Sequence, residues 1–522
     1  GHHEQSMALT GIGYARAMRR KQIFIATASS GPGSMNMVTA AGVALSNRLP
    51  LLLLPGDVFA SRFPDPVLQQ IENFNSPVEN QNDAFKPVSR FFDRITRPEQ
   101  ILNSLPQAIN IMLDPADCGP ATISISQDVQ GESFDYPEAF FEERVHEIRR
   151  IHPDPNQVKV AAEKLKNSQQ PIIISGGGVL YSEAEEELSN FAKKHNIPVT
   201  ATAMGIGCMT KDDPYYIGGI GGLGEKSANN LSKDTDLALA IGTKLADFTT
   251  GSWANFESDN FQLVSLNAAR FDTVKHLATP IVSDAKIGLQ QLSEALGDWK
   301  APDNWYQKAI QERTAWEAHV QKQSGPTNQE EPSYAHAVGA VYRNADPSDI
   351  VVTAAGGLVG EVVQVWKPKQ INTFETEWGF SCMGYEISGA LGIKMAKPDQ
   401  DVVVFLGDGS YLLNNTDIYS SVLYDQKLII VLCDNGGHMV INRLQLAKGG
   451  KEYICNLRAA RATNLQFVDF ENHAKSLGAN AETVSSTSEL EAAYKRAKDS
   501  DKTYVIVIKT HGYEWLEGSA FW

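Results

Sequence analysis

Two polar tetrapeptides, each placed directly after an apolar run, constrain the fold of this chain more than any other feature. Gly407-Asp408-Gly409-Ser410 follows the run Val402 to Leu406, and Asp434-Asn435-Gly436-Gly437 follows the run Leu428 to Cys433. Short apolar runs that end in such residues predict buried β-strands. The polar residues then lie just past the carboxyl ends of two strands, where open α/β sheets hold their ligands.

A helix expected at about Asn415 to Tyr424 separates the two strands and makes a β-α-β unit with adjacent, parallel strand tips. A carboxylate from Asp408 and a carboxamide from Asn435 then converge on one point. The carbonyl of Gly437, which no side chain obstructs, offers a third oxygen. Hard oxygen ligands of this kind suit Mg²⁺ or Ca²⁺.

The backbone at Gly409 and Ser410 predicts the second half of the same site. These residues open a helix, so their N–H groups are free to bind a phosphate. Together the two halves predict a metal-bridged diphosphate site. The alternative interpretation is a plain strand-to-helix turn followed by an Asp-Asn-Gly-Gly loop.

This spacing resembles the signature of thiamine diphosphate (ThDP) enzymes, a Gly-Asp-Gly triplet followed later in the chain by Asn-Asn. Asp434 replaces the first Asn, and the second, which is the metal ligand in that family, is retained as Asn435. The resemblance implies Mg²⁺ ligation by Asp408, Asn435 and Gly437. It also implies cofactor binding by Gly356, Gly357, Gly407, Asp408, Gly409, Ser410, Asn435 and Gly437.

The amino-terminal segment resembles the pyrimidine-binding half of the acetolactate synthase group of ThDP enzymes. The likeness lies in His3 to Ala8, Gly13 to Ala17, an expected strand at Gln22 to Ala26, and Ser30 to Asn36. It implies that Glu4 hydrogen-bonds the aminopyrimidine ring of ThDP.

Glu4 is the predicted catalytic residue. A carboxylic acid shared with ring nitrogen N1′ favours the imino tautomer, and the cofactor's own imino group then removes the proton at C2. The alternative is a solvated charge near a helix start, beside a Gly1-His2-His3 segment that has the composition of a tag.

Met383 is a further predicted cofactor contact, within Trp378 to Glu386. The resemblance implies that the residue at this position wedges between the two rings of ThDP and forces a bent conformation. An unbranched, polarizable side chain suits that role, although it suits a hydrophobic core equally well.

Composition agrees with a large enzyme. The 522 residues exceed one core and give roughly three domains. A net charge of −16 with scattered Lys and Arg disfavours nucleic acid and anionic membranes as partners. No apolar run approaches the roughly 18 residues of a membrane span. Five cysteines without metal-site spacing predict reduced thiols in a cytoplasmic protein.

The predicted fold class is α/β, with three doubly wound parallel-sheet domains. We expect a pyrimidine-binding domain at residues 1–150, a central Rossmann-like domain at 151–325 and a diphosphate-binding domain at 333–522. Polar, Pro-containing linkers at Ile151 to Pro155 and Gln321 to Pro332 mark the boundaries. The first domain of the resembling family has further elements before the Glu, so either the numbered chain lacks an amino-terminal piece or the domain is incomplete. We expect the former, because a parallel sheet without its first strands would expose a long hydrophobic edge at Ile23 to Ala26.

Glycine-rich turns in the central segment admit two interpretations. Relatives in this family bind FAD or nucleotides in the middle domain, which would make Gly176-Gly177-Gly178 and Gly242-Thr243-Lys244 a dinucleotide site. The first turn lacks the G-x-G-x-x-G pattern, and Gly218 to Gly224 follows a Pro-Tyr-Tyr segment that we expect to be a loop rather than a strand. We therefore prefer structural turns.

Several stretches resemble more specifically the trihydroxycyclohexanedione hydrolases of inositol breakdown. They are Asn47 to Pro50, Leu54 to Ala60, Phe63 to Gln70, Pro87 to Gln100, Asp114 to Pro120 and Ser381 to Ile387. The resemblance implies ThDP- and Mg²⁺-dependent hydrolytic cleavage of a carbon–carbon bond in a polyhydroxylated cyclic 1,2-diketone, which gives 5-deoxy-glucuronate. It also implies a homodimer or homotetramer with active sites at the subunit interface.

The chain departs from the hydrolase pattern at His3, where Asn is usual, and at Gly437 to Val440, which replaces a Gly-Phe-Gly-Cys type stretch. Both positions border the implied substrate pocket, so a related substrate stays open. Candidates for the proton transfers, by position alone, are His3, Glu377, Tyr411 and His438. An acetolactate synthase-like ligase or decarboxylase, and a noncatalytic ThDP-binding protein, are the alternative functions.

Overall fold

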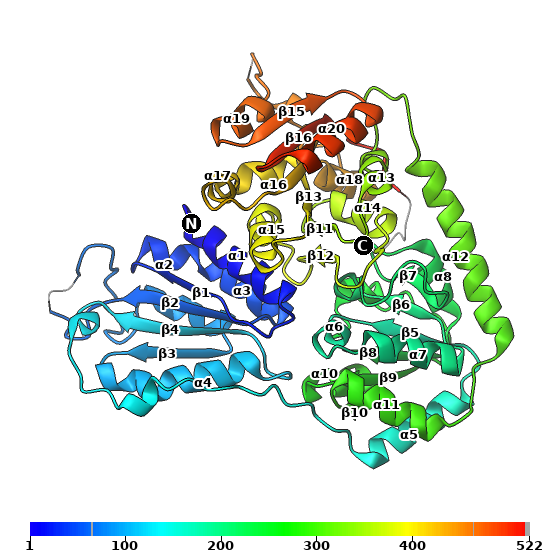
Figure 1. The fold of residues 1–522 in the computed structure, drawn as a ribbon, viewed down its shortest axis with the longest axis horizontal. Helices are drawn as coiled ribbons and strands as arrows, with labels where there is room; N and C mark the ends of the chain where they lie inside the picture. Colours follow the sequence, from blue (N-terminus) through cyan, green and yellow to red (C-terminus); the bar gives the residue numbers. More distant parts are fainter. Residues whose placement is uncertain (64–65, 463, 517–522) are drawn as a thin grey trace. The chain divides into compact units, whose positions relative to one another are not determined.

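The computed structural model describes residues 1–63, 66–462 and 464–516. Within these ranges the strands form three sheets, which fall in residues 25–126, 171–282 and 350–509, and every strand pairing in them is parallel (Figure 1). The predicted fold class is therefore confirmed. Pro64 and Asp65, in the Phe63 to Gln70 stretch, and residues 517–522 lie outside the described part of the chain.

The first sheet has the strand order β1-β2-β4-β3, and β1 is an edge strand. Its first strand begins three residues later than the sequence predicted. The strands are β1 (Ile25–Ala28), β2 (Leu51–Asp57), β3 (Phe91–Ile95) and β4 (Pro120–Ser126), and the helices around them are α1 (Glu4–Ala17), α2 (Pro32–Asn36), α3 (Val38–Asn47) and α4 (Ile101–Leu113).

The leucines of β2 show why helices cover both faces of this sheet. Successive side chains of a strand point to opposite faces. Leu51 packs beside Gly11 of α1, whereas Leu52 belongs to a buried cluster that contains Ala108 and Met112 of α4. The apolar run therefore fills two cores, one beneath α1 and one beneath α4 (Figure 1).

The second sheet has the order β10-β9-β8-β5-β6-β7. Here Ile173 packs into one buried cluster and Ile172 and Ile174 into another, so this sheet too is covered on both faces. Its strands are β5 (Pro171–Ser175), β6 (Val199–Ala201), β7 (Tyr216–Gly219), β8 (Leu237–Ile241), β9 (Gln262–Asn267) and β10 (Thr279–Val282). Its helices are α5 (Pro155–Asn167), α6 (Gly178–Tyr181), α7 (Glu185–His195), α8 (Lys226–Asp234), α9 (Asp247–Thr250), α10 (Arg270–Val274), α11 (Ala285–Leu296) and α12 (Asp303–Gln323).

The expectation that Gly218 to Gly224 follows a loop is wrong. Gly218 and Gly219 end strand β7, and α8 begins shortly after Gly224, so the segment is a strand-to-helix turn. Its sequence from Gly219 to Gly224 also fits G-x-G-x-x-G. The sequence-level objection to a dinucleotide site at this turn therefore fails.

The hydrogen bonds of this turn nevertheless explain its glycines without a ligand. The N–H of Gly219 donates to the Glu225 carboxylate at 2.8 Å, and that of Gly221 donates to Asn229 Oδ1 at 2.9 Å. The N–H of Gly222 donates to the Phe248 carbonyl at 2.7 Å. A diphosphate needs such donors free, and Glu225 is a buried acidic group at the helix start.

The Gly176 and Gly242 turns also pack against each other through their backbones. A Cβ on Gly176 would lie 2.5 Å from the Gly242 carbonyl oxygen, and one on Gly178 would lie 2.6 Å from the Gly242 α-carbon. Only glycine permits this approach. The contacts support the preferred interpretation of structural turns.

The third sheet has the order β12-β11-β13-β14-β16-β15. Its strands are β11 (Ile350–Thr353), β12 (Phe374–Thr376), β13 (Val402–Gly407), β14 (Ile429–Asp434), β15 (Asn480–Val484) and β16 (Tyr504–Lys509). The helices of this part of the chain are α13 (Tyr334–Asn344), α14 (Leu358–Val365), α15 (Tyr385–Ala396), α16 (Asp408–Leu413), α17 (Thr416–Leu423), α18 (Met439–Ala447), α19 (Phe470–Ser476) and α20 (Thr487–Asp499). Helix α12 continues to Gln323, so the predicted linker at Gln321 to Pro332 starts inside a helix.

The chain forms two compact units. One comprises residues 1–149, 379–398 and 414–426, and the other comprises 150–378, 399–413 and 427–522. Helices α15 and α17 thus belong with the first sheet, although they lie among the strands of the third sheet in sequence. None of the helices in the described ranges is both long and apolar enough to cross a membrane.

Within the first unit, α1 and α15 cross at very short range. A Cβ on Gly13 would overlap the carbonyl of Gly389, and a Cβ on Gly392 would overlap the carbonyl of Thr10. Glycine at these positions lets the two backbones touch, which fixes where α1 begins relative to α15.

Candidate active site

Strands β13 and β14 bring the two polar tetrapeptides to one edge of the third sheet. They are parallel neighbours, with Gly407 paired to Cys433. Helix α16 begins at Asp408, directly at the tip of β13, and Asn435 follows the last residue of β14. The predicted strand arrangement is confirmed, and it places the two candidate metal ligands on adjacent strand tips.

The carboxyl group of Asp408 is buried, with 3% of the residue exposed. Burial and the neighbouring charge of Asp434 raise the pKa of Asp408 to about 7, while the N–H groups of Gly409 and Gly437 act in the opposite direction. A cation placed beside the Asp408 carboxylate would therefore stabilise its charged form.

The side-chain amide of Asn435 is divided between two environments. Its Nδ2 donates a hydrogen bond to the hydroxyl of Tyr334 at 2.6 Å. Its Oδ1 is buried and accepts no hydrogen bond from any described residue. A buried oxygen without a partner is unfavourable unless a ligand satisfies it.

The backbone at Gly436 and Gly437 completes this edge. Gly436 has φ +78° and nothing within 4 Å of the place a Cβ would occupy, and Gly437 has φ +138°. The carbonyl of Gly436 accepts from the N–H of Leu457 at 2.9 Å, and Gly437 pairs with Asn456 in an isolated bridge. Glycine is required at both positions because L side chains rarely adopt such angles.

These groups fit a hard divalent cation. Asp408 offers a carboxylate, Asn435 an unsatisfied amide oxygen and Gly437 a carbonyl, which are the ligand types that Mg²⁺ accepts together with phosphate oxygens and water. This mixed oxygen set is the candidate metal centre. In the described ranges no three His, Cys, Asp or Glu side chains gather as a metal site.

The two glycines before α14, Gly356 and Gly357, differ in how accessible their α-carbons are. Gly356 has φ +83° and open space around its α-carbon, which lets a ligand approach the backbone. At Gly357 a Cβ would overlap the indole of Trp515. The next residue, Leu516, donates its N–H to the carboxylate of Glu361 at 2.9 Å.

Glu4 begins α1 in the other unit. Asn36 Nδ2 donates a hydrogen bond to Glu4 Oε2 at 3.0 Å, and the site of a Cβ on Gly33 lies 3.3 Å from Glu4 Oε1. The bond from Asn36 is the main cause that lowers the pKa of Glu4. The Ser30 to Asn36 segment singled out in the sequence therefore contacts the predicted catalytic carboxylate.

The turn that contains Met383 is tied to α1 through Asn414. Asn414 Oδ1 accepts from Ser6 Oγ at 2.5 Å, and Asn414 Nδ2 donates to the carbonyl of Gly384 and to Ser388 Oγ, each at 3.0 Å. Gly384 has φ +89°. These bonds fix the backbone beside Met383, which is itself partly buried.

The four candidates for proton transfer have different environments. The hydroxyl of Tyr411 is hydrogen-bonded to His473 Nδ1 at 2.9 Å, and burial raises its pKa, so Tyr411 is a core residue. Glu377 is buried with 2% exposed. His438 is exposed and directly precedes α18, and His3 directly precedes α1; neither side chain makes a capping hydrogen bond to its helix.

Three further residues at the strand-tip edge were not anticipated from the sequence. Tyr334 contacts Asn435, Trp515 covers Gly357, and Glu361 holds the segment that contains Trp515. Tyr334 is the first residue of α13, and no local pattern relates it to a residue that lies a hundred positions later. A single sequence contains no signal for that contact.

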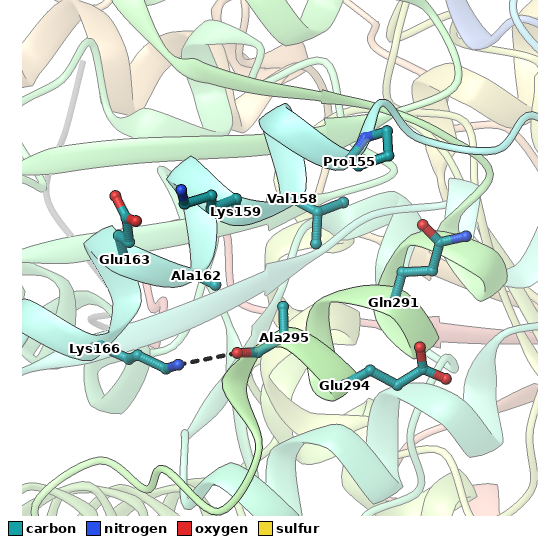
Figure 2. A pocket seen from close by; sticks show the side chains of 9 residues that line it. All are labelled: Pro155, Val158, Lys159, Ala162, Glu163, Lys166, Gln291, Glu294 and Ala295. Carbon is teal, nitrogen blue, oxygen red and sulfur yellow. Dashed lines mark hydrogen bonds between the residues drawn. The ribbon is translucent and has the colours of Figure 1, made fainter.

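A surface groove of about 520 Å³ lies between α5 and α11, and Figure 2 shows its lining. Lys166 Nζ donates to the carbonyl of Ala295 at 2.9 Å across it. The lining combines Val158 and Ala162 with a few charged side chains, and it includes none of the residues predicted to bind the cofactor.

Three family models match this chain in the expected order. They describe the amino-terminal TPP binding domain, the central domain and the carboxyl-terminal TPP binding domain of thiamine pyrophosphate enzymes, and they match residues 1–76, 158–292 and 354–508.

Curated relatives align along nearly the whole chain. A protein of Halalkalibacterium halodurans named 3D-(3,5/4)-trihydroxycyclohexane-1,2-dione hydrolase is 40% identical over 98% of this chain and 85% of its own length. Proteins with the same name from Lacticaseibacillus casei and Bacillus subtilis are 38% and 37% identical over 100% of this chain, and over 85% and 86% of their own lengths.

Proposed function

Because this chain belongs to the thiamine pyrophosphate enzymes and is similar over its full length to trihydroxycyclohexanedione hydrolases, we propose that it hydrolyses a carbon–carbon bond in a polyhydroxylated cyclic 1,2-diketone of inositol breakdown. The proposal extends to the residues of the site, to the metal and to the oligomeric state.

In the proposed site, Asp408, Asn435 and the carbonyl of Gly437 hold Mg²⁺. The support is the chemistry of the donors: a buried carboxylate whose pKa is raised to about 7, and a buried amide oxygen without a partner in the described ranges. A buried charge and a buried oxygen without a partner each cost the folded state free energy, and a divalent cation bound between them would offset that cost. Gly356, Gly407, Gly409 and Ser410 would hold the diphosphate, and the open backbone at Gly356 supports that assignment. For Gly357 the proposal covers only its N–H, because Trp515 covers its α-carbon.

When bound, ThDP supplies the nucleophilic carbon and the electron sink for carbon–carbon cleavage. In this proposal Glu4 holds a proton between its carboxyl group and the pyrimidine nitrogen N1′. The hydrogen bond from Asn36 orients Glu4 Oε2 and leaves Oε1 for the ring. Met383, on a turn fixed by Asn414, would pack against the two rings.

The overall reaction balances as a hydrolysis. The bond between the two carbonyl carbons breaks, one of these carbons keeps an oxygen from water and ends as a carboxylic acid, and the other takes a proton and ends as an aldehyde. The ring opens, so a single product, 5-deoxy-glucuronate, is expected. His438 and His3 are the proposed groups for the proton transfers, since the other two candidates, Tyr411 and Glu377, are buried.

The single observation that supports this function best is the convergence of Asp408 and Asn435 on adjacent strand tips, in a chain of which 98% aligns with one of these hydrolases. Purified protein with ThDP and Mg²⁺ should convert trihydroxycyclohexane-1,2-dione to one open-chain acid, detected by mass spectrometry. Conversion of pyruvate to acetolactate or acetaldehyde, with no turnover of the diketone, would instead support the ligase or decarboxylase alternative.

We also propose a homodimer or homotetramer in which one copy supplies Glu4 and its partner supplies Asp408 and Asn435. Exposed apolar side chains support an interface on the first unit, among them Tyr419 and Leu423 of α17 and Tyr424 directly after it, which are 41%, 55% and 60% exposed. Light scattering of the active protein should give at least the dimer mass. A fully active monomer contradicts the shared site.

The proposal also includes the domain ranges and the cellular location. We place the domains at residues 1–150, 151–325 and 333–522, since each range contains one sheet. We place the protein in the cytoplasm, because its five cysteines are reduced and four of them are buried. Fractionation of producing cells tests the location.

A further inference from the structure

The hydrogen bond between Tyr334 and Asn435 determines which end of the Asn435 amide faces the candidate metal site. Oxygen and nitrogen of a side-chain amide occupy nearly the same volume, so the shape of the pocket alone cannot distinguish the two orientations. Only the oxygen can ligate a cation. An orientation with the NH₂ group toward the metal would direct two positively polarised hydrogens at it.

Tyr334 is held rigidly. It is the first residue of α13, whose cap is Ser333, and it is 4% exposed. Its ring meets the indole of Trp515 edge to face, with centroids 5.5 Å apart and planes at 83°. The place a Cβ would occupy on Gly407 lies 3.9 Å from its hydroxyl oxygen, which puts the hydroxyl at the tip of β13.

The hydrogen bond itself determines how the hydroxyl is used. A Tyr hydroxyl can donate or accept, but the nitrogen of a side-chain amide carries only donors. The Tyr334 oxygen faces Asn435 Nδ2 at 2.6 Å, so in this contact the hydroxyl accepts and the amide N–H donates.

We propose that Tyr334 is a positioning residue for the divalent cation: its hydroxyl accepts from Asn435 Nδ2 at 2.6 Å and thereby points the buried, unpartnered Oδ1 at the metal. This inference rests on the proposed metal site, and it assigns the site a residue outside both strand-tip motifs. Tyr334 acts through Asn435 and does not itself ligate the metal.

The test measures metal affinity directly. Mn²⁺ is titrated into the full-length protein with excess ThDP, and free Mn²⁺ is counted by electron paramagnetic resonance. Tyr334→Phe keeps the ring and its contact with Trp515 but removes the hydroxyl. We expect the Kd for Mn²⁺ to rise about tenfold, the loss expected for one hydrogen bond of about 1.4 kcal/mol. An unchanged Kd, within twofold, overturns the proposal.

Tyr494→Phe is the matched control. Tyr494 is also fully buried in the same unit, and its hydroxyl donates to Asp349 Oδ2 at 2.7 Å. Its loss removes one buried tyrosine hydrogen bond away from the strand tips, so we expect the Kd for Mn²⁺ to stay within twofold. Thermal unfolding without metal shows whether the two variants are equally folded.

A double-mutant cycle separates orientation from general support. Asn435→Asp presents an oxygen in either orientation of the side chain, so Tyr334→Phe should change the Kd less than twofold in that background. An equal, tenfold loss in both backgrounds overturns the proposal, because the hydroxyl would then act through the fold. If Tyr334→Phe alone does not fold, the Kd is measured in the Asn435→Asp protein with and without the Tyr334→Phe substitution.

Failure of the metal site itself gives a different result. If Asp408→Ala and Asn435→Leu both bind Mn²⁺ like the unmodified protein, the proposed ligands are wrong. If those two variants lose the metal and Tyr334→Phe does not, the ligands stand and only the role of Tyr334 is overturned.

Discussion

Asn36 and Glu4 are joined by a hydrogen bond of 3.0 Å between Nδ2 and Oε2. The bond links the residue that ends α2 to the residue that begins α1, and it lowers the pKa of Glu4. A carboxylate held by one oxygen keeps its other oxygen available for a ligand. This geometry agrees with the proposed contact to the pyrimidine ring.

Glu4→Gln should abolish most turnover without unfolding the protein. The amide keeps the size and the hydrogen bond to Asn36 but cannot hold the proton shared with N1′. We expect kcat to fall by at least about 100-fold, the usual range for loss of a proton-transferring group. The apparent Tm and the ThDP affinity should stay close to those of the unmodified protein.

Glu138→Gln serves as the control for this variant, because Glu138 is an exposed carboxylate in the same unit. Its kcat should not change. Turnover of Glu4→Gln at the unmodified level would remove Glu4 from the mechanism.

Asp408→Ala should lose metal-dependent binding of ThDP. The substitution removes the only carboxylate of the proposed ligand set, and we expect the affinity for ThDP in the presence of Mg²⁺ to fall at least about 100-fold. Isothermal titration calorimetry measures this, with Asp499→Ala, an exposed residue at the end of α20, as the control. Undiminished ThDP binding by the Asp408 variant would contradict the proposed site.

Gly392→Ala should destabilise the protein although alanine favours helices. A Cβ at position 392 of α15 would overlap the carbonyl of Thr10 in α1, and overpacking of this kind costs about 1–3 kcal/mol. We expect a lower apparent Tm by differential scanning calorimetry.

Gly360→Ala in α14 is the matched control. There the nearest atom, on Leu223, lies 3.4 Å from the new Cβ, which is ordinary contact. Relief of the glycine penalty should leave this variant equal to the unmodified protein or more stable by up to about 1 kcal/mol. Equal losses in the two variants would show that the α1–α15 crossing is not the cause.

Glu361 should make stability fall as pH rises. Burial raises the pKa of Glu361 from 4.5 to about 7, so folding takes up a proton between these values. Below pH 4.5 the Glu361 carboxyl is neutral in the folded and in the unfolded protein, so its burial costs no charging free energy. Stability is lost as pH rises toward 7, and by pH 8 the charged group costs the folded state about 3 kcal/mol.

Glu361→Gln is neutral at every pH and keeps an oxygen for the N–H of Leu516. It should therefore have a higher apparent Tm than the unmodified protein at pH 8 and a similar one at pH 5. Glu163→Gln, an exposed carboxylate of α5, removes the same charge and should show no such difference. A difference that does not depend on pH would rule out ionisation of Glu361 as the cause.

Much of the fold follows from local patterns. The strands before Asp408 and Asn435 differ from the predicted apolar runs by one residue at their ends. Buried parallel strands are short continuous apolar runs, and glycine or polar residues mark where each run stops. The strand before the Gly218 to Gly224 turn is hard to predict, because β7 (Tyr216–Gly219) has only four residues, two of them glycines, and is too short to show a periodicity.

Local sequence specifies which chemical groups stand at the strand tips, because the order of apolar run, Gly-Asp-Gly and second apolar run is a local property. Local patterns identify Asp408, Asn435, Glu4 and the family resemblance. How those groups are held depends instead on contacts between distant parts of the chain. The contacts of Tyr334 with Asn435 and of Trp515 with Gly357 join residues more than a hundred positions apart, and only folding brings such residues within hydrogen-bond or van der Waals range.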